Sequence, residues 1–284
     1  MYRIGLSTCS KVIDEELFRQ YREAGIAAAE ISTAFDKYDS LDYRAIERNA
    51  RKYGIELWSY HLPFWPFSEI DPSVASLQKH AISYFSELIK KASDIGIPRF
   101  VIHPSGEPIA DADRPERMRV ATDTLATLAE VCVQNGAILA IEDLPRTCLG
   151  NCSAEILSLL RGHDAMRVCF DTNHLLGGED PAAFIRAVGD KLVTLHVSDY
   201  DFVDERHWLP GEGDIDWSGI VEALRDVDYQ GVFMYEISPK CPKTILRDRD
   251  LVYTDFVRNA KEILSGKKPT VFATRIPGLG PEVF

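Results

Sequence analysis

Four apolar segments of the sequence each end on a side chain that can bind a metal or move a proton. The segments ILAIE, RVCFD, LVTLH and VFMYE end on Glu142, Asp171, His196 and Glu236. Their β-branched and aromatic residues are typical of buried strands, and stretches of helix length separate them. Because the carboxyl ends of parallel strands meet at one edge or mouth, these four side chains are expected to face one another.

Such a cluster requires a cation. Three carboxylates that share a site raise one another's pKa unless a positive charge neutralises them. Three carboxylates and one imidazole suit Mn²⁺, Mg²⁺ or Co²⁺, and Zn²⁺ and Fe²⁺ are compatible with the same ligands. One such residue alone would more often be a polar end to a strand, but four in succession favour a divalent metal site.

The rest of the chain repeats the alternation of strand and helix. The expected strands cover 2–6, 27–31, 55–61, 99–103, 138–142, 166–171, 192–196 and 231–236. The expected helices cover 14–24, 42–53, 73–95, 115–134, 153–160, 181–188, 217–227 and 250–264. Eight mostly apolar strands that alternate with eight helices predict an α/β fold, the (β/α)₈ TIM barrel.

The rival architecture is a doubly wound open sheet. That fold would show a glycine-rich turn after its first strand, whereas this chain reads STCSKVID there. No repeat or linker divides the sequence, so residues 1–266 are predicted to form one barrel domain. Residues 267–284 form a tail rich in proline and glycine, which is either disordered or packed on a neighbour.

Composition narrows the classes of function. The 284 residues carry a net charge of −12, which disfavours a broad nucleic-acid footprint. No apolar run reaches the roughly 20 residues that cross a bilayer, and the start of the chain does not resemble a secretory signal, so a cytoplasmic protein without membrane contact is expected. The six scattered cysteines are expected to be reduced thiols.

The motifs around these residues resemble those of a known family. IEDLPR, FDTNH, LHVSDYD, HWLPGEGDIDW and YEIS are similar to motifs of the xylose-isomerase-like barrel superfamily, in its sugar phosphate isomerase/epimerase branch. The resemblance implies that Glu142, Asp171, His196 and Glu236 bind the metal and that Glu142 and Glu236 also form the acid/base pair. A metal on a substrate carbonyl and its neighbouring hydroxyl acidifies the C–H between them and stabilises an enediolate.

Further histidines are expected at the same mouth. His61 and His103 end strands, His174 follows Asp171 by three residues, and His207 lies in the loop after the seventh strand. In the sugar branch, such residues bind substrate hydroxyls or shuttle protons. The endonuclease IV type, a relative on the same barrel, uses corresponding positions for a three-zinc cluster, which this chain could supply from these histidines, the four strand-end residues and Glu205. The chain departs from the endonuclease IV pattern at two places. Glu205 stands where that family has Asp, and DLPRTC after Glu142 stands where that family has a glycine-rich segment.

Loop residues complete the set of candidates. Trp65, Phe64 and Trp208 lie in loops at the expected mouth, where they could stack on a sugar ring or serve loop packing. Arg146 and Lys240 closely follow Glu142 and Glu236 and are candidates to bind an anionic group of the substrate.

These observations predict a metal-dependent isomerase or epimerase of carbohydrate metabolism that acts on a small sugar, sugar phosphate or cyclitol, with a homo-oligomer as an option. One alternative is a dehydratase on a keto-cyclitol or dehydroshikimate-like substrate, in which the enolate expels a β-hydroxyl. A second is a phosphodiester hydrolase of the endonuclease IV type with several zinc ions. A carbohydrate-binding module without catalysis is the remaining option.

Overall fold

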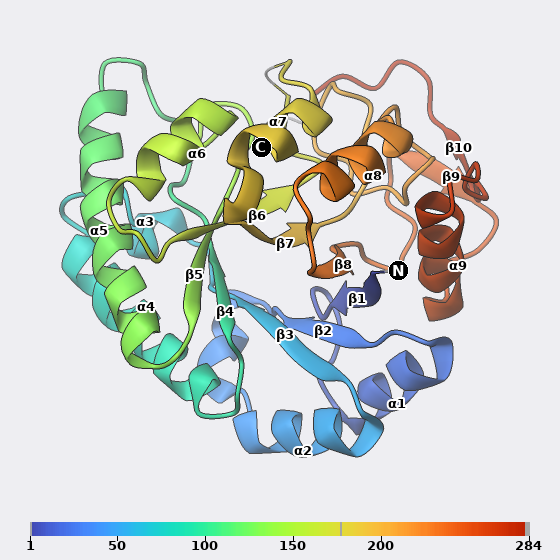
Figure 1. Cartoon of the computed structure of the whole chain (residues 1–284), viewed down its shortest axis with the longest axis horizontal. Coiled ribbons are helices and arrows are strands. Elements are labelled where there is room, and N and C mark those ends of the chain that lie inside the picture. The colour runs from blue at the N-terminus through green and yellow to red at the C-terminus, as the bar shows by residue number, and fades with distance from the viewer. Residues whose placement is uncertain (1, 177, 282–284) are drawn as a thin grey trace.

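The computed structural model describes residues 2–176 and 178–281 and contains a barrel of eight parallel strands (Figure 1). The strands are β1 (Arg3–Ser7), β2 (Ala28–Ile31), β3 (Glu56–His61), β4 (Arg99–Ile102), β5 (Ile138–Glu142), β6 (Arg167–Asp171), β7 (Leu192–His196) and β8 (Val232–Tyr235). They are hydrogen-bonded in chain order, and β8 pairs with β1. Beyond β7, the Val197 N–H donates to the Met234 carbonyl at 2.8 Å and brings β7 against β8. The predicted (β/α)₈ barrel is therefore confirmed.

Helices surround the strands (Figure 1). They are α1 (Glu15–Ala24), α2 (Tyr43–Tyr53), α4 (Gln78–Ser93), α5 (Arg114–Gln134), α6 (Ser153–Leu160), α7 (Pro181–Val188), α8 (Trp217–Asp226) and α9 (Tyr253–Leu264). Local chemistry explains their bounds, as α1 illustrates. The Asp14 carboxylate accepts the Leu17 N–H at the start of α1, and Gly25 ends it with a φ of +89°, which glycine adopts without a steric cost.

The structure differs from the expected elements in places where side chains compete for the backbone. The helix predicted from Ser73 begins only at Gln78, because Asp71 accepts the Ser73 N–H and turns precede the first helical bond. Short elements that the sequence pattern did not predict are the helix α3 (Phe67–Ile70), the 3₁₀ helices η1 (Phe35–Ser40) and η2 (Gly189–Lys191), and the strands β9 (Ile245–Arg247) and β10 (Ala273–Arg275).

Small and bulky side chains fill the interior of the barrel below the mouth. One buried cluster contains Ala28, Trp58, Val232 and Met234, and its indole N–H donates to the Thr194 hydroxyl at 3.0 Å. Gly5 leaves room for this packing, because a Cβ there would lie 2.6 Å from the Met234 side chain. The packed interior leaves the carboxyl ends of the strands as the place for chemistry.

Part of the tail folds back onto the barrel loops. β10 pairs antiparallel with β9, and the Arg275 guanidinium donates to the Glu212 carbonyl and the Asp214 carboxylate. The described part of residues 267–284 therefore lies against the loop between β7 and α8, a contact that no feature of the sequence announces.

Candidate functional site

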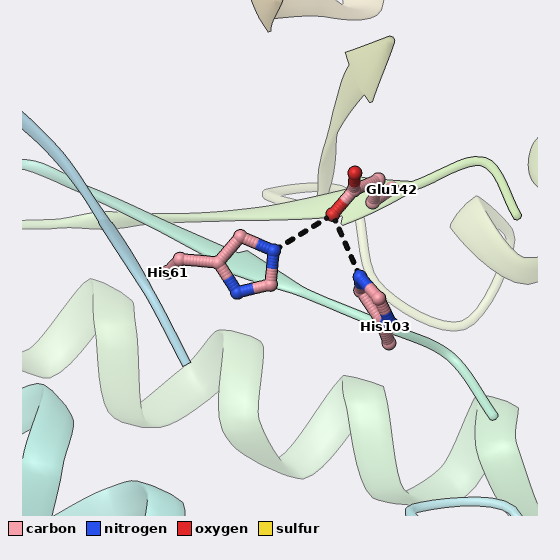
Figure 2. Close-up of side chains that lie close together, drawn as sticks. All are labelled: His61, His103 and Glu142. Atoms are coloured by element: carbon pink, nitrogen blue, oxygen red, sulfur yellow. Dashed lines mark hydrogen bonds and ion pairs between the residues drawn. The ribbon is translucent and has the colours of Figure 1, made fainter. Parts of the chain in front are cut away.

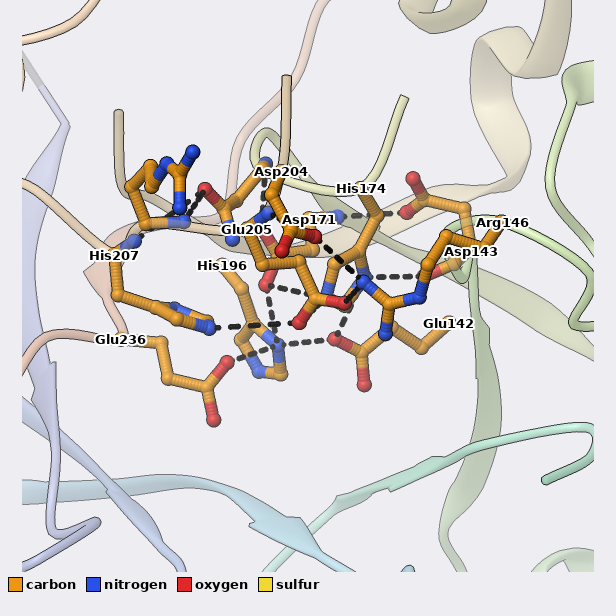
Figure 3. Close-up of polar contacts among 12 residues, drawn as sticks. Glu142, Asp143, Arg146, Asp171, His174, His196, Asp204, Glu205, His207 and Glu236 are labelled. Carbon is orange, nitrogen blue, oxygen red and sulfur yellow. Dashed lines mark hydrogen bonds and ion pairs between the residues drawn. The ribbon is translucent and has the colours of Figure 1, made fainter. Parts of the chain in front are cut away.

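Four strand-end side chains converge at the mouth of the barrel (Figure 3). Asp171 and His196 are paired in register at the ends of β6 and β7, Glu142 ends β5, and Glu236 directly follows β8. One donor atom from each lies within 4.8 Å of all the others. Nδ1 of His196 is central, at 2.8 Å from Oε1 of Glu142 and 3.1 Å from Oε2 of Glu236. The structure thus brings together the four residues that the sequence predicts as metal ligands.

Their surroundings fit a divalent cation. Oδ2 of Asp171 is buried and accepts no hydrogen bond from the described residues, although it lies 3.9 Å from Nδ1 of His196. A buried carboxylate oxygen without a donor is costly unless another positive group faces it. Three carboxylate oxygens and one imidazole nitrogen are ligands that Mn²⁺, Mg²⁺, Co²⁺, Zn²⁺ and Fe²⁺ accept.

The charged side chains of this cluster shift one another's pKa values. Burial raises the pKa of Asp171, which His174 lowers and the neighbouring carboxylates raise again, to a net value of about 6. Burial alone would lower the pKa of His61, but the Glu142 carboxylate raises it to about 9. Protonated imidazoles can therefore balance the carboxylates, and a bound metal would replace those protons.

Glu142 also contacts two further histidines (Figure 2). Its Oε2 lies 3.1 Å from Nε2 of His61 and 3.1 Å from Nε2 of His103, while its Oε1 faces His196. His61, His103 and Glu142 form a second group that could hold a cation. His61 is buried, whereas His103 is partly accessible and stacks on Phe64 with ring centroids 4.6 Å apart.

The long loop after β7 places Glu205 and His207 over the cluster. Oε2 of Glu205 lies 3.7 Å from Nε2 of His174 and 3.8 Å from Nε2 of His207. The loop is held by Asn173, whose side-chain oxygen accepts the Arg206 N–H at 3.0 Å. His207 has a φ of +49°, a left-handed conformation that only a few per cent of non-glycine residues adopt.

A cavity of about 660 Å³ opens beside the cluster. His103 and His174 line it on the side of the four strand-end residues. The remaining lining side chains are Phe64, Trp65, Phe67, Glu107, Pro108, Leu144, Pro145, Arg146, Cys148 and Glu205. The cavity therefore offers a small molecule one polar wall next to the carboxylates and one aromatic and aliphatic wall, as small-molecule sites commonly do.

The predicted substrate-binding residues occupy different environments. His103, His174, Trp65 and Arg146 line the cavity, and His61 lies behind His103 with ring centroids 5.1 Å apart. The Arg146 guanidinium contacts the carboxylates of Glu107, Asp204 and Glu205, so its charge is already shared among acidic neighbours.

Lys240 and Trp208 lie outside this cavity. Lys240 is exposed and lines a separate hollow with Lys11 and Tyr253, so its role as an anion ligand stays a prediction. Trp208 is buried, and its N–H donates to the Thr244 hydroxyl at 2.8 Å. Loop packing, rather than stacking on a sugar, therefore explains Trp208.

Sequence reasoning assigned no role to Glu30 and Glu107. Glu30 lies in β2, and its carboxylate contacts His196 across the barrel. The available signal was its place near a strand end, which it shares with the four predicted ligands. Glu107 follows β4 in a loop and contacts Arg146 in the cavity wall, a contact that no local pattern announces.

Comparison with known proteins places the chain in a family. The family model described as Xylose isomerase-like TIM barrel matches residues 18–253. The chain belongs to this family. The match confirms the resemblance that the strand-end motifs indicated.

Individual members of the family are distant in sequence. An uncharacterized protein of Methanocaldococcus jannaschii is 24% identical over 181 residues, which cover 60% of this chain and 62% of that protein. A D-psicose 3-epimerase of Enterocloster bolteae is 27% identical over 168 residues, 56% of this chain and 54% of the epimerase. The matched part of the chain thus spans about six tenths of the length of the Methanocaldococcus jannaschii protein and about half of the length of the epimerase. A crystal structure of a D-tagatose 3-epimerase-like protein superposes with a TM-score of 0.76 at 19% identity, covering 93% of this chain and 97% of that one, and shows the shared fold.

The helices give no sign of a membrane span. Within residues 2–176 and 178–281, none combines the length and the apolar character needed to cross a bilayer.

Proposed function

We propose that the chain is a metal-dependent isomerase or epimerase that acts on a small carbohydrate by proton transfer next to a carbonyl. The observation that carries this proposal is the convergence of Glu142, Asp171, His196 and Glu236 within 4.8 Å beside a cavity lined by aromatic side chains. The similarity to a D-psicose 3-epimerase supports a ketose or a related keto compound of the carbohydrate class as the substrate.

The four residues of the cluster share one role in this proposal, and two of them have a second role. Glu142, Asp171, His196 and Glu236 would hold the divalent cation, with Mn²⁺, Mg²⁺ or Co²⁺ as the first choices and Zn²⁺ or Fe²⁺ as alternatives. When bound, the cation supplies Lewis-acid stabilisation of negative charge on the substrate oxygens. Proton transfer falls to the carboxylates of Glu142 and Glu236.

The environments of the two glutamates suit different roles. Glu142 is buried and engaged by three imidazoles, so its carboxylate can pass a proton to or from His61 or His103. The Glu236 side chain is 15% exposed, so its carboxylate is accessible as a base. Burial raises the pKa of Glu236, but the neighbouring His196 has the larger net effect and lowers it, so the carboxylate is ionised. A base on each side of the substrate carbon allows epimerisation, whereas one base suffices for isomerisation.

The side chains that line the cavity suit a ligand that has hydroxyl groups on one face and C–H groups on the other. His103, His174 and Glu205 can bind hydroxyl groups, while Phe64 and Trp65 can cover the C–H face of a sugar. Trp65 is 62% exposed, so its indole is free to pack on a ligand at the rim.

Exchange of substrate hydrogen with solvent tests this function even when the product is unidentified. Chelator-treated protein is supplied with Mn²⁺, Mg²⁺ or Co²⁺ and incubated with ketoses, keto-sugar acids and inososes in D₂O. The proposal expects metal-dependent incorporation of deuterium at the carbon next to the carbonyl, read by proton NMR. A new double bond in the product would instead establish the dehydratase, and sugar binding without exchange or turnover would establish a binding module.

A second candidate function is phosphodiester hydrolysis with several metals. It is favoured by one observation, the placement of His61 and His103 on Oε2 of Glu142, because these three residues could hold a further cation that would supply Lewis-acid help. The acidic balance of the chain and the acidic side chains around Arg146 act against a polyanionic substrate. Cleavage of abasic-site DNA by the zinc-loaded protein would reverse the ranking.

A further inference from the structure

Glu30 contacts the side of His196 that faces away from the other carboxylates. Its Oε2 lies 3.0 Å from Nε2 of His196 and accepts the Ser59 hydroxyl at 2.8 Å. Both Glu30 and His196 are fully buried. We propose that Glu30 is a positioning residue that orients the His196 imidazole for metal binding, an inference that rests on the metal-dependent function proposed above.

The two nitrogens of the His196 ring face opposite partners. Nδ1 lies among the carboxylates of Glu142, Glu236 and Asp171, and Nε2 lies against the carboxylate of Glu30. A neutral imidazole binds a metal through the nitrogen that carries no proton. An acceptor at Nε2 keeps the proton there, and the lone pair of Nδ1 is then presented to the cation site.

Glu30 also fixes the rotation of the ring. The His196 ring stacks on His61 with centroids 5.5 Å apart and an interplanar angle of 16°, which sets its plane. Stacking alone would tolerate a half-turn of the ring that puts ring carbons where the nitrogens lie. The hydrogen bond to Glu30 removes that freedom, because the half-turned ring would present a carbon to the carboxylate.

A purely structural purpose does not account for Glu30. Its Oε1 is buried and has no hydrogen-bond partner among the described residues. Burying a carboxylate with one orphaned oxygen is unfavourable, and an apolar side chain of similar size often fills such a position at no loss of stability. β2 contributes none of the four predicted ligands, and Glu30 brings a side chain of this strand to the metal cluster.

Metal affinity of substituted proteins tests the inference. We compare wild type with Glu30→Leu, which removes the acceptor, and Glu30→Gln, which keeps an acceptor oxygen without the charge. The readouts are the dissociation constant for Mn²⁺, from competition with a chelating dye, and the visible absorption spectrum of the Co²⁺-loaded protein. We expect Glu30→Leu to weaken binding about 10- to 100-fold, as loss of such partners does elsewhere, with a smaller loss for Glu30→Gln and an altered Co²⁺ spectrum in both.

The matched control is Glu212→Gln. Glu212 is another buried carboxylate, in the loop after β7, but it pairs with Arg247 of β9 and touches none of the four ligands. Its substitution is expected to lower the thermal unfolding temperature and to leave the Mn²⁺ dissociation constant unchanged. If Glu30→Leu does not fold, Ser59→Ala removes the other hydrogen bond to Glu30 and is expected to weaken Mn²⁺ binding by a smaller factor.

The possible results separate this inference from the proposed function. Wild-type protein that binds no Mn²⁺ or Co²⁺ would overturn the proposed function and this inference with it. Wild-type affinity and a wild-type Co²⁺ spectrum in folded Glu30→Leu would overturn the role of Glu30 alone.

Discussion

Oε1 of Glu142 lies 2.8 Å from Nδ1 of His196, although the two residues are 54 positions apart in the sequence. The contact arises because β5, β6 and β7 are neighbours in the barrel, with Glu142 in register with Cys169 and Asp171 in register with His196. Oε2 of the same carboxylate faces His61 and His103, which end or follow β3 and β4. Glu142 therefore connects the two halves of the mouth.

Substitution of Glu236 separates catalysis from metal binding. Glu236→Gln keeps the size of the side chain and one oxygen, but it removes the accessible base. We expect the turnover number to fall by about 10²- to 10⁴-fold, the usual contribution of a general base, while Mn²⁺ still binds with reduced affinity. The measurements are deuterium exchange from D₂O and the Mn²⁺ dissociation constant. The control is Glu87→Gln, an exposed glutamate on α4, and turnover near the wild-type rate in Glu236→Gln would exclude its role as base.

Removal of metal is expected to destabilise the fold. A cation that binds only the folded protein adds about 2.7 kcal/mol to the free energy of unfolding at a concentration 100 times its dissociation constant. Calorimetry after chelation should therefore show a lower unfolding temperature that Mn²⁺, Mg²⁺ or Co²⁺ restores in a concentration-dependent manner. If neither the chelator nor the added cation changes the unfolding temperature, the result would contradict a metal site formed by Glu142, Asp171, His196 and Glu236.

Strand-end residues were predictable from sequence because their position follows from local pattern alone. A run such as RVCFD identifies a buried strand, and the barrel topology then places Asp171 at the mouth whatever its distant contacts are. The same logic identified His61 and His103. It predicts which residues share a mouth, but not which atoms face one another.

Contacts between distant segments were not predictable in this way. The bond between Glu30 and His196 joins residues 166 positions apart across the barrel, and neither strand reveals it. Trp208 occupies a loop that could be exposed, but Thr244, which lies far along the chain, gives its N–H a buried partner. The pairing of β10 with β9 likewise depends on two short segments that have no strand pattern of their own.

The number of metals distinguishes the two candidate functions. An isomerase or epimerase is expected to hold about one Mn²⁺ or Co²⁺ per chain, and His103→Asn should then leave that number unchanged and raise the Michaelis constant, since His103 lines the cavity. Inductively coupled plasma mass spectrometry of the dialysed protein gives the ratio. Two or more ions per chain, with loss of one in His103→Asn, would show that His61, His103 and Glu142 hold a cation of their own.

Stability at acidic pH is expected to depend on Asp255, which lies far from the metal cluster. At the start of α9, its carboxylate accepts the Val252 N–H at 2.8 Å and two hydrogen bonds from Arg249. Although burial acts in the opposite direction, these bonds lower the pKa of Asp255. A carboxylate whose pKa is lower in the folded state stabilises the fold above its unfolded pKa of about 4, and the contribution is lost as the pH falls through the folded value.

Asp255→Asn is therefore expected to cost about 1 kcal/mol in the free energy of unfolding at pH 7, the usual value of a helix cap. The difference from wild type should stay constant between pH 7 and 5 and shrink below pH 4, because the wild-type carboxyl then becomes neutral like the amide. Urea unfolding of the metal-free proteins, prepared with a chelator, measures this difference at several pH values without interference from metal binding. If the difference in the free energy of unfolding between wild type and Asp255→Asn is as large at pH 3 as at pH 7, the hydrogen-bond geometry of Asp255, and not its charge, stabilises the start of α9.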